Sequence, residues 1–256
     1  MEHQLWFTAI LNNLLHGVVT PLLVKIGRAP SDPAHPIPNY VAMEVLVILL
    51  MMVGVVLLRM GLSVESPGKF QQVMEVAVKF IQDMCEEIIG HGSSRYVAML
   101  GTLGIFIVLC NLLGLLPTLQ TPTGHIQVTL GCAVAVFLYY NFQGVRQHGV
   151  FGYLKHLCGP MLAIAIVMFP IEIIGNLGRL LSLSVRLYAN MMVGDLLEKV
   201  FGVLVPAAFP QFIAVTVAIL APPVFMVLHI FVSFLQAYIF MLLPAVYISL
   251  AVSEEH

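Results

Sequence analysis

Two apolar segments in the C-terminal part of the chain are too long to cross a membrane upright. They occupy residues 161–201 and 211–250, and a helix of about forty residues runs roughly 60 Å, twice the hydrocarbon thickness of a bilayer. Pro206 and Pro210 lie between the two segments and predict a turn. We therefore expect a long helical hairpin, spanning about 161–250, that lies nearly flat in the membrane and packs on other protein.

The composition excludes an ordinary soluble protein. Of the 256 residues, 60% are hydrophobic and 9% are charged, whereas a typical soluble domain carries about 25% charged residues. The net charge of −2 provides no basic surface for nucleic acid. The four cysteines are widely spaced and form neither a metal-binding pattern nor a disulfide framework. We expect a polytopic membrane protein with no cofactor, no metal site and no nucleic-acid partner.

The chain divides into an N-terminal segment, residues 1–39, and a membrane domain, residues 40–256. The first segment mixes apolar and polar residues and ends in a proline-rich linker, which predicts an interfacial segment rather than a cleaved signal peptide. Apolar stretches in the membrane domain predict upright spans near 40–58, 97–117 and 127–143.

Residues 67–90 show a different pattern. Apolar residues recur there at helical spacing, and charged residues fill the other side, which predicts an amphipathic helix on the membrane surface. The predicted fold is therefore an all-α polytopic membrane protein. It has upright spans, one surface amphipathic helix and the long C-terminal hairpin.

The distribution of basic residues predicts the orientation. Lys and Arg occur in 59–96 and 144–157 but not in 118–126. The positive-inside rule places the first two segments in the cytoplasm. The N-terminus is then outside and the C-terminus inside, although Lys25 and Arg28 argue for the reverse.

The first long segment carries polar residues that a lipid-facing helix would not tolerate. An arginine at membrane depth costs about 2.5–3.5 kcal/mol on insertion scales. Glu172, Arg179 and Arg186 are spaced by seven residues, two helical turns apart, and Asn176 and Asn190 fall on the same side. Small residues beside this stripe would let another helix approach closely; they are Gly175, Gly178, Ser182 and Ser184.

The second long segment presents His229, Ser233 and Gln236 on one face. In a hairpin centred just past Pro210, Arg186 would face Gln236, and Asp195 would face His229. Asp195 would lie about 13.5 Å along the helix from Arg186 and on the opposite face.

This separation suggests a mechanism. A carboxylate and an imidazole can exchange protons near neutral pH, whereas an arginine only holds a fixed positive charge. Arg186 between two aqueous half-paths would attract a passing carboxylate, help it to release its proton and block leakage.

Simpler roles remain open for these residues. Arg179 could snorkel to an interface or pair with Glu172, Arg186 could belong to a structural ion pair, and Asp195 could be an interfacial acid. His229 could be a hydrogen-bonded core histidine, and Gln236 and Asn190 could join helices. Two other functions have less support. A self-contained secondary transporter would want inverted repeats, and an intramembrane enzyme would need more than His229 and Ser233.

Several motifs resemble the a subunit of F-type ATP synthase. They are SVRLYANMMVGD (184–195), LHIFVSFLQAYIFMLLPAVYISLA (228–251), NLLGLLPT (111–118) and a PT-x-x-x-x-VTL segment (122–130). The resemblance implies a non-catalytic stator subunit in a bacterial inner membrane, with its N-terminus periplasmic and its C-terminus cytoplasmic. The implied partners are a ring of c subunits, the peripheral-stalk b subunits and the remaining ATP synthase subunits.

The resemblance also assigns roles to residues. Arg186 falls on the family's essential arginine, Asp195 and His229 on its half-channel acid and histidine, and Gln236 on the glutamine that faces the arginine. Asn190 matches the asparagine after the arginine, and Glu172 an acid of the other aqueous path. These residues, with Arg179 and Ser233, form the predicted ion-translocation set. His229 favours protons over sodium.

The sequence departs from the family at four places. Asp195 stands where many bacterial members carry Glu, and Ala189 where Gly is common. Arg179 stands where Lys is frequent. The connector has Gly124, His125 and Gln127 where the family usually has an Asp and an Asn, so an inlet role for it is in doubt.

Overall fold

The computed structural model describes residues 5–25, 35–90, 92–116, 118–158, 162–208 and 211–252, and regular structure in these ranges is entirely helical. The elements are α1 Trp6–Lys25, α2 Asn39–Gly61, α3 Lys69–Ile89, α4 Ser94–Leu113, the 3₁₀ helix η1 Pro122–Gly124, α5 Ile126–Cys158, α6 Leu162–Ala208 and α7 Gln211–Val252. All of the α-helices except α3 contain segments long and apolar enough to cross a membrane. The predicted fold class, an all-α polytopic membrane protein, is confirmed.

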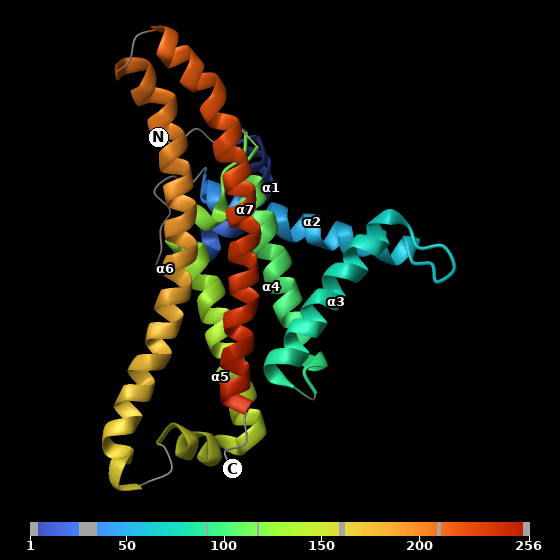
Figure 1. The fold of residues 1–256 in the computed structure, drawn as a ribbon, viewed down its shortest axis with the longest axis vertical. Coiled ribbons are helices and arrows are strands. Elements are labelled where there is room, and N and C mark those ends of the chain that lie inside the picture. Colours follow the sequence, from blue (N-terminus) through green and yellow to red (C-terminus); the bar gives the residue numbers. More distant parts are fainter. Residues whose placement is uncertain are drawn as a thin grey trace.

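Helices α6 and α7 form the long hairpin that the sequence predicts. They contain 47 and 42 residues and run antiparallel along the longest dimension of the molecule (Figure 1). Helix α7 continues through Pro222, Pro223 and Pro244 without a break. Figure 1 shows α2 running across the direction of this hairpin, so an upright α2 leaves α6 and α7 strongly inclined in the bilayer.

The core lies where α4 and α5 pack beside the hairpin. Helix α6 contributes Leu183, Leu187 and Met191, which are spaced by four residues and therefore share one face. Gly104 of α4 leaves the space that the Met241 side chain of α7 occupies. The same cluster includes Tyr96, Leu100, Ile107, Val136, Tyr140, Phe240 and Ile248.

Helix α5 extends beyond the span expected at 127–143. It reaches Cys158, and a kink at Gly149, with φ of 72°, turns its last part. After the kink the Tyr153 ring packs where a Cβ of Gly144 would lie, and its hydroxyl donates to Asn141 Oδ1 at 2.9 Å. The positive φ at position 149 favours glycine there.

Helices α1 and α2 form a smaller cluster with the end of α4. The buried Asn12 side chain bonds both backbone groups of Ile37, at 3.0 and 3.2 Å, and so fixes the chain that leads into α2. The predicted interfacial segment is thus largely a helix of 20 residues. Its interfacial placement stays a prediction, and most of the proline-rich linker, 26–34, lies outside the described residues.

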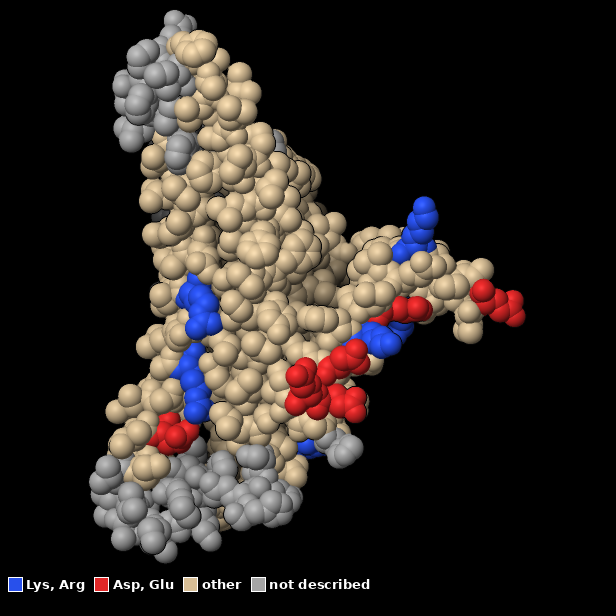
Figure 2. Space-filling model, viewed as in Figure 1, with Lys and Arg blue, Asp and Glu red and all other residues tan. Residues whose placement is uncertain are grey.

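Helix α3 is amphipathic, as predicted. Ile81, Met84 and Cys85 are buried against the neighbouring helices, and Ser249 of α7 donates to the Ile88 carbonyl at 3.0 Å. A second group of apolar side chains on α3 is exposed, including Phe70, Val73, Val76 and Phe80. Figure 2 shows acidic and basic side chains gathered over this helix. An exposed apolar strip beside charges is typical of a helix on a membrane surface.

Candidate functional site

The charged stripe of α6 contains one neutralised arginine, Arg179. Its guanidinium lies 3.5 Å from Glu172, donates to Asn176 Oδ1 at 3.1 Å and has its Cζ 5.5 Å from the centre of the Tyr247 ring. Asn176 Oδ1 also accepts from the Tyr140 hydroxyl at 3.1 Å. The pairing of Arg179 with Glu172, one of the roles left open above, is therefore present.

Arg186 has different surroundings. Its guanidinium donates to Ser182 Oγ at 3.3 Å, and no carboxylate among the described residues lies at ion-pair distance from it. Figure 2 shows basic side chains along α6, with an acidic patch next to the basic group that lies nearer the end of the helix. Within the described part of the chain, the charge of Arg186 is not neutralised.

The side of α6 near Arg186 is open. A Cβ atom added at Gly175 or Gly178 would meet nothing within 4 Å, and Ser182 is exposed. The close approach of another helix expected at Ser184 is made by α5. Ser184 is buried, and its hydroxyl lies 3.2 Å from that of Thr129 on α5, because position 184 falls on the core-facing side of the helix.

Gln236 supplies an unused acceptor in the interior. Its side chain is buried, and its Oε1 has no hydrogen-bond partner in the described structure. No hydrogen bond joins Gln236 to Arg186 in these residue ranges, so their predicted contact stays a prediction. A buried carbonyl without a donor is unfavourable, and a guanidinium with unused N–H groups is its natural partner.

His229 confirms the predicted register of the hairpin. Its Nδ1 lies 3.2 Å from the place that a Cβ of Gly194 would take, so the ring rests against the α6 backbone just before Asp195. On the other side, His229 Nε2 lies 3.3 Å from the Asn111 carbonyl oxygen at the end of α4. The Asp195 side chain lies outside the described residues, so its contact with His229 stays a prediction.

The Ser233 hydroxyl bonds a backbone carbonyl and not the imidazole of His229. It is fully buried, and its hydroxyl donates to the His229 carbonyl at 2.7 Å. A serine nucleophile would instead place its hydroxyl on a base nitrogen. The geometry therefore does not support an intramembrane hydrolase built on His229 and Ser233.

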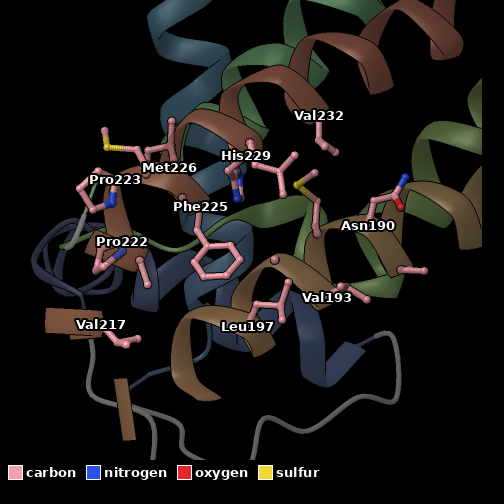
Figure 3. A pocket seen from close by; sticks show the side chains of 17 residues that line it. Asn190, Val193, Leu197, Val217, Pro222, Pro223, Phe225, Met226, His229 and Val232 are labelled. Carbon is pink, nitrogen blue, oxygen red and sulfur yellow. The ribbon is translucent and has the colours of Figure 1, made fainter. Parts of the chain in front are cut away.

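A cavity of about 720 Å³ lies between α6 and α7 beside the end of α4. Among the residues described as lining the cavity, His229 and Asn190 have the most polar side chains. Figure 3 shows them coming from opposite walls. Most of the remaining lining is apolar and includes Leu197, Val217, Phe225 and Met226. The cavity therefore lies next to the imidazole of His229, the one histidine in the described part of the hairpin.

From the sequence alone, Asn111 is expected to serve only local capping or packing. The structure gives it two contacts of interest, because its backbone carbonyl meets His229 and its Oδ1 accepts from Thr123 Oγ1 at 2.6 Å. The sequence feature that marked Asn111 was the NLLGLLPT motif, which begins with this residue. No group of three or more potential metal ligands occurs in the described ranges.

Comparisons with known proteins show which sequences this chain resembles. The family model for the ATP synthase A chain matches residues 41–249. The chain is 43% identical to an ATP synthase subunit a from Koribacter versatilis over the full length of both. It is 42% identical to that of Solibacter usitatus over 96% of this chain and all of the relative. A third relative, from Geotalea daltonii, is 35% identical over the full length of both.

Proposed function

Because this chain belongs to the ATP synthase A chain family, we propose that it provides two half-channels that carry protons to and from the carboxylates of a rotating c-subunit ring. It is a multi-pass membrane protein and a component of a larger complex rather than its catalytic subunit. Proton flow through the half-channels would turn the ring and so drive ATP synthesis elsewhere in the complex.

The observation that carries the proposal is the contrast between Arg186 and Arg179. Arg179 has Glu172 at 3.5 Å, whereas Arg186 has no described carboxylate at ion-pair distance and lies beside the open side of α6. An arginine at membrane depth is expected to have a partner. A carboxylate from another chain, passing along the open side, would supply that partner transiently.

The first half-channel would use the region around His229. The cavity, Asn190 and His229 lie together, and Asp195 follows the glycine that contacts the imidazole. A carboxylate and an imidazole can pass protons near neutral pH. In this proposal they deliver protons to the ring carboxylate on one side of Arg186.

The second half-channel would begin at Glu172. This residue precedes Arg186 on α6 by about 21 Å at 1.5 Å per residue, in the direction opposite to Asp195. The two carboxylates thus flank the fixed charge of Arg186. A cation between two aqueous paths repels protons and prevents direct leakage, and Gln236 would orient its guanidinium.

The remaining assignments follow from the same role. The proposed partners are the c ring on the open side of α6, the peripheral-stalk b subunits and the other ATP synthase subunits. We place the protein in a bacterial inner membrane, with its N-terminus periplasmic and its C-terminus cytoplasmic. A self-contained secondary transporter is the alternative, but the polar residues of α6 and α7 have no matching counterpart in the first half of the sequence.

Photocrosslinking in the assembled complex tests the proposed ring contact. A benzophenone-bearing residue at position 185, which is exposed beside Arg186, should crosslink to a small ring subunit. A matched probe at position 55, exposed on α2, should not. Crosslinks from position 185 that contain no ring subunit would exclude this surface as the stator face.

A further inference from the structure

The contacts of His229 determine which ring nitrogen carries its hydrogen. Nε2 lies 3.3 Å from the Asn111 carbonyl oxygen. A carbonyl oxygen can only accept a hydrogen bond, so Nε2 must be the donor. The neutral ring then has its lone pair on Nδ1, and Nδ1 is the nitrogen that lies against α6 at Gly194.

The Asn111 carbonyl is available because it belongs to the last turn of a helix. Helix α4 ends at Leu113, and carbonyls in a last turn lack the usual intrahelical donor. The Asn111 oxygen accepts from the Gly114 N–H at 3.3 Å. A carbonyl oxygen has two lone pairs, so the second remains for His229.

The Asn111 side chain is itself fixed. Asn111 and Thr123 are fully buried, and Thr123 Oγ1 donates to Asn111 Oδ1 at 2.6 Å. Thr123 belongs to η1, so this bond ties the connector to the end of α4 beneath the imidazole. Opposite them, Gly194 provides the clearance that the ring requires.

We propose that Asn111 and Thr123 are positioning residues that hold His229 in the tautomer with hydrogen on Nε2, so that Nδ1 alone accepts and returns protons. The inference rests on the proposed half-channel. In each cycle Nδ1 takes a proton from water or a carboxylic acid on the α6 side, whose O–H bond breaks, and this gives an imidazolium. It then releases that proton to water or a carboxylate on the same side, while the Nε2–H bond stays intact. His229 is thus a one-sided acceptor facing α6 rather than a bridge that takes a proton on one nitrogen and releases it from the other.

The test uses the complete complex in liposomes, with ¹⁵N-labelled histidine and His229 assigned by its loss in His229→Gln. Solid-state NMR should show hydrogen on Nε2 in the neutral ring of the wild type. Thr123→Val removes a bond to the Asn111 side chain and not the bond at His229, so it should reduce the preference for this tautomer by at most about fivefold, the full effect of losing one hydrogen bond. Proton conduction should fall with it, and Thr123→Ser should restore both.

Thr102→Val is the matched control, because Thr102 donates to the Ala98 carbonyl of its own helix at 2.7 Å and faces away from His229; it should change neither quantity. Hydrogen on Nδ1 in the wild type, or a Thr123→Val protein with an unchanged tautomer, overturns the inference. Wild-type conduction by His229→Gln would instead remove His229 from the proposed half-channel, and with it the claim that Nδ1 carries protons. The NMR signal requires no transport, so the two failures are distinguishable.

Discussion

Gly194 and His229 face each other across the hairpin of α6 and α7, with the imidazole Nδ1 3.2 Å from the place where a Cβ of Gly194 would lie. This contact marks the register of two helices of 47 and 42 residues. It also explains why position 194 is small, because a side chain there would displace the ring by a few tenths of an ångström. The displacement would change the distance between Nε2 and the Asn111 carbonyl.

Gly194→Ala should therefore slow proton pumping severalfold while the complex still assembles. The added methyl pushes the imidazole away from α6, toward the Asn111 carbonyl on its other side, and so distorts the 3.3 Å contact between Nε2 and that oxygen. Gly54→Ala is the control, since a Cβ there meets nothing within 4 Å. Pumping is measured by quenching of a pH-sensitive dye in inverted membranes. If Gly194→Ala and Gly54→Ala pumped protons at equal rates, this would contradict the contact between Gly194 and His229.

The ion pair of Glu172 and Arg179 should give non-additive effects. The side chains of Arg179 and Glu172 are 30% and 34% exposed, so the pair contributes on the order of 0.2–1 kcal/mol. Glu172→Gln and Arg179→Gln each remove the same interaction. The double variant should accordingly pump no worse than the worse single variant. Losses that multiply would show that the two residues act independently.

Cys85 should react slowly with maleimide. Burial raises the pKa of its thiol, so less reactive thiolate is present at a given pH. Its alkylation rate should rise only at higher pH than that of a cysteine placed at the exposed position 78 of α3. The comparison uses variants in which the other cysteines are replaced. If the two cysteines were alkylated at equal rates across the pH range, the face of α3 that carries Ile81, Met84 and Cys85 would not be packed against the neighbouring helices.

Gly149→Ala should destabilise the turned end of α5. The φ and ψ of Gly149 are 72° and 167°, a region used almost only by glycine, and an L-residue there costs on the order of 1–3 kcal/mol. Gly131→Ala in the same helix has free space around the new Cβ and should be neutral or slightly stabilising. The readout is the temperature at which the detergent-solubilised complex loses this subunit. Equal temperatures would argue against the kink.

Much of the architecture could be predicted because it depends on length and spacing. Two forty-residue apolar segments cannot stand upright, and the alternation of apolar and charged residues identified α3. The register of the hairpin followed from placing polar residues of the two segments opposite each other, and the contact of Gly194 with His229 confirms it.

The parts that the sequence did not predict depend on backbone geometry and on tertiary neighbours. The contact of His229 with Asn111 is made to a carbonyl, which every residue carries, so residue type does not reveal it. The extension of α5 past 143 depends on the positive φ of Gly149. The small residues of α6 predicted a close helix approach, but residue type did not reveal that α5, through Thr129, makes it at Ser184.

The central claim is that Arg186 is the fixed charge between two proton paths, and Arg186→Ala tests it most directly. ATP-driven proton pumping and proton-driven ATP synthesis by the assembled complex should both be abolished, while hydrolysis by the soluble sector persists. Arg179→Ala, which removes the arginine already paired with Glu172 at 3.5 Å, should retain a measurable fraction of both. Pumping at the wild-type rate by Arg186→Ala would contradict the account.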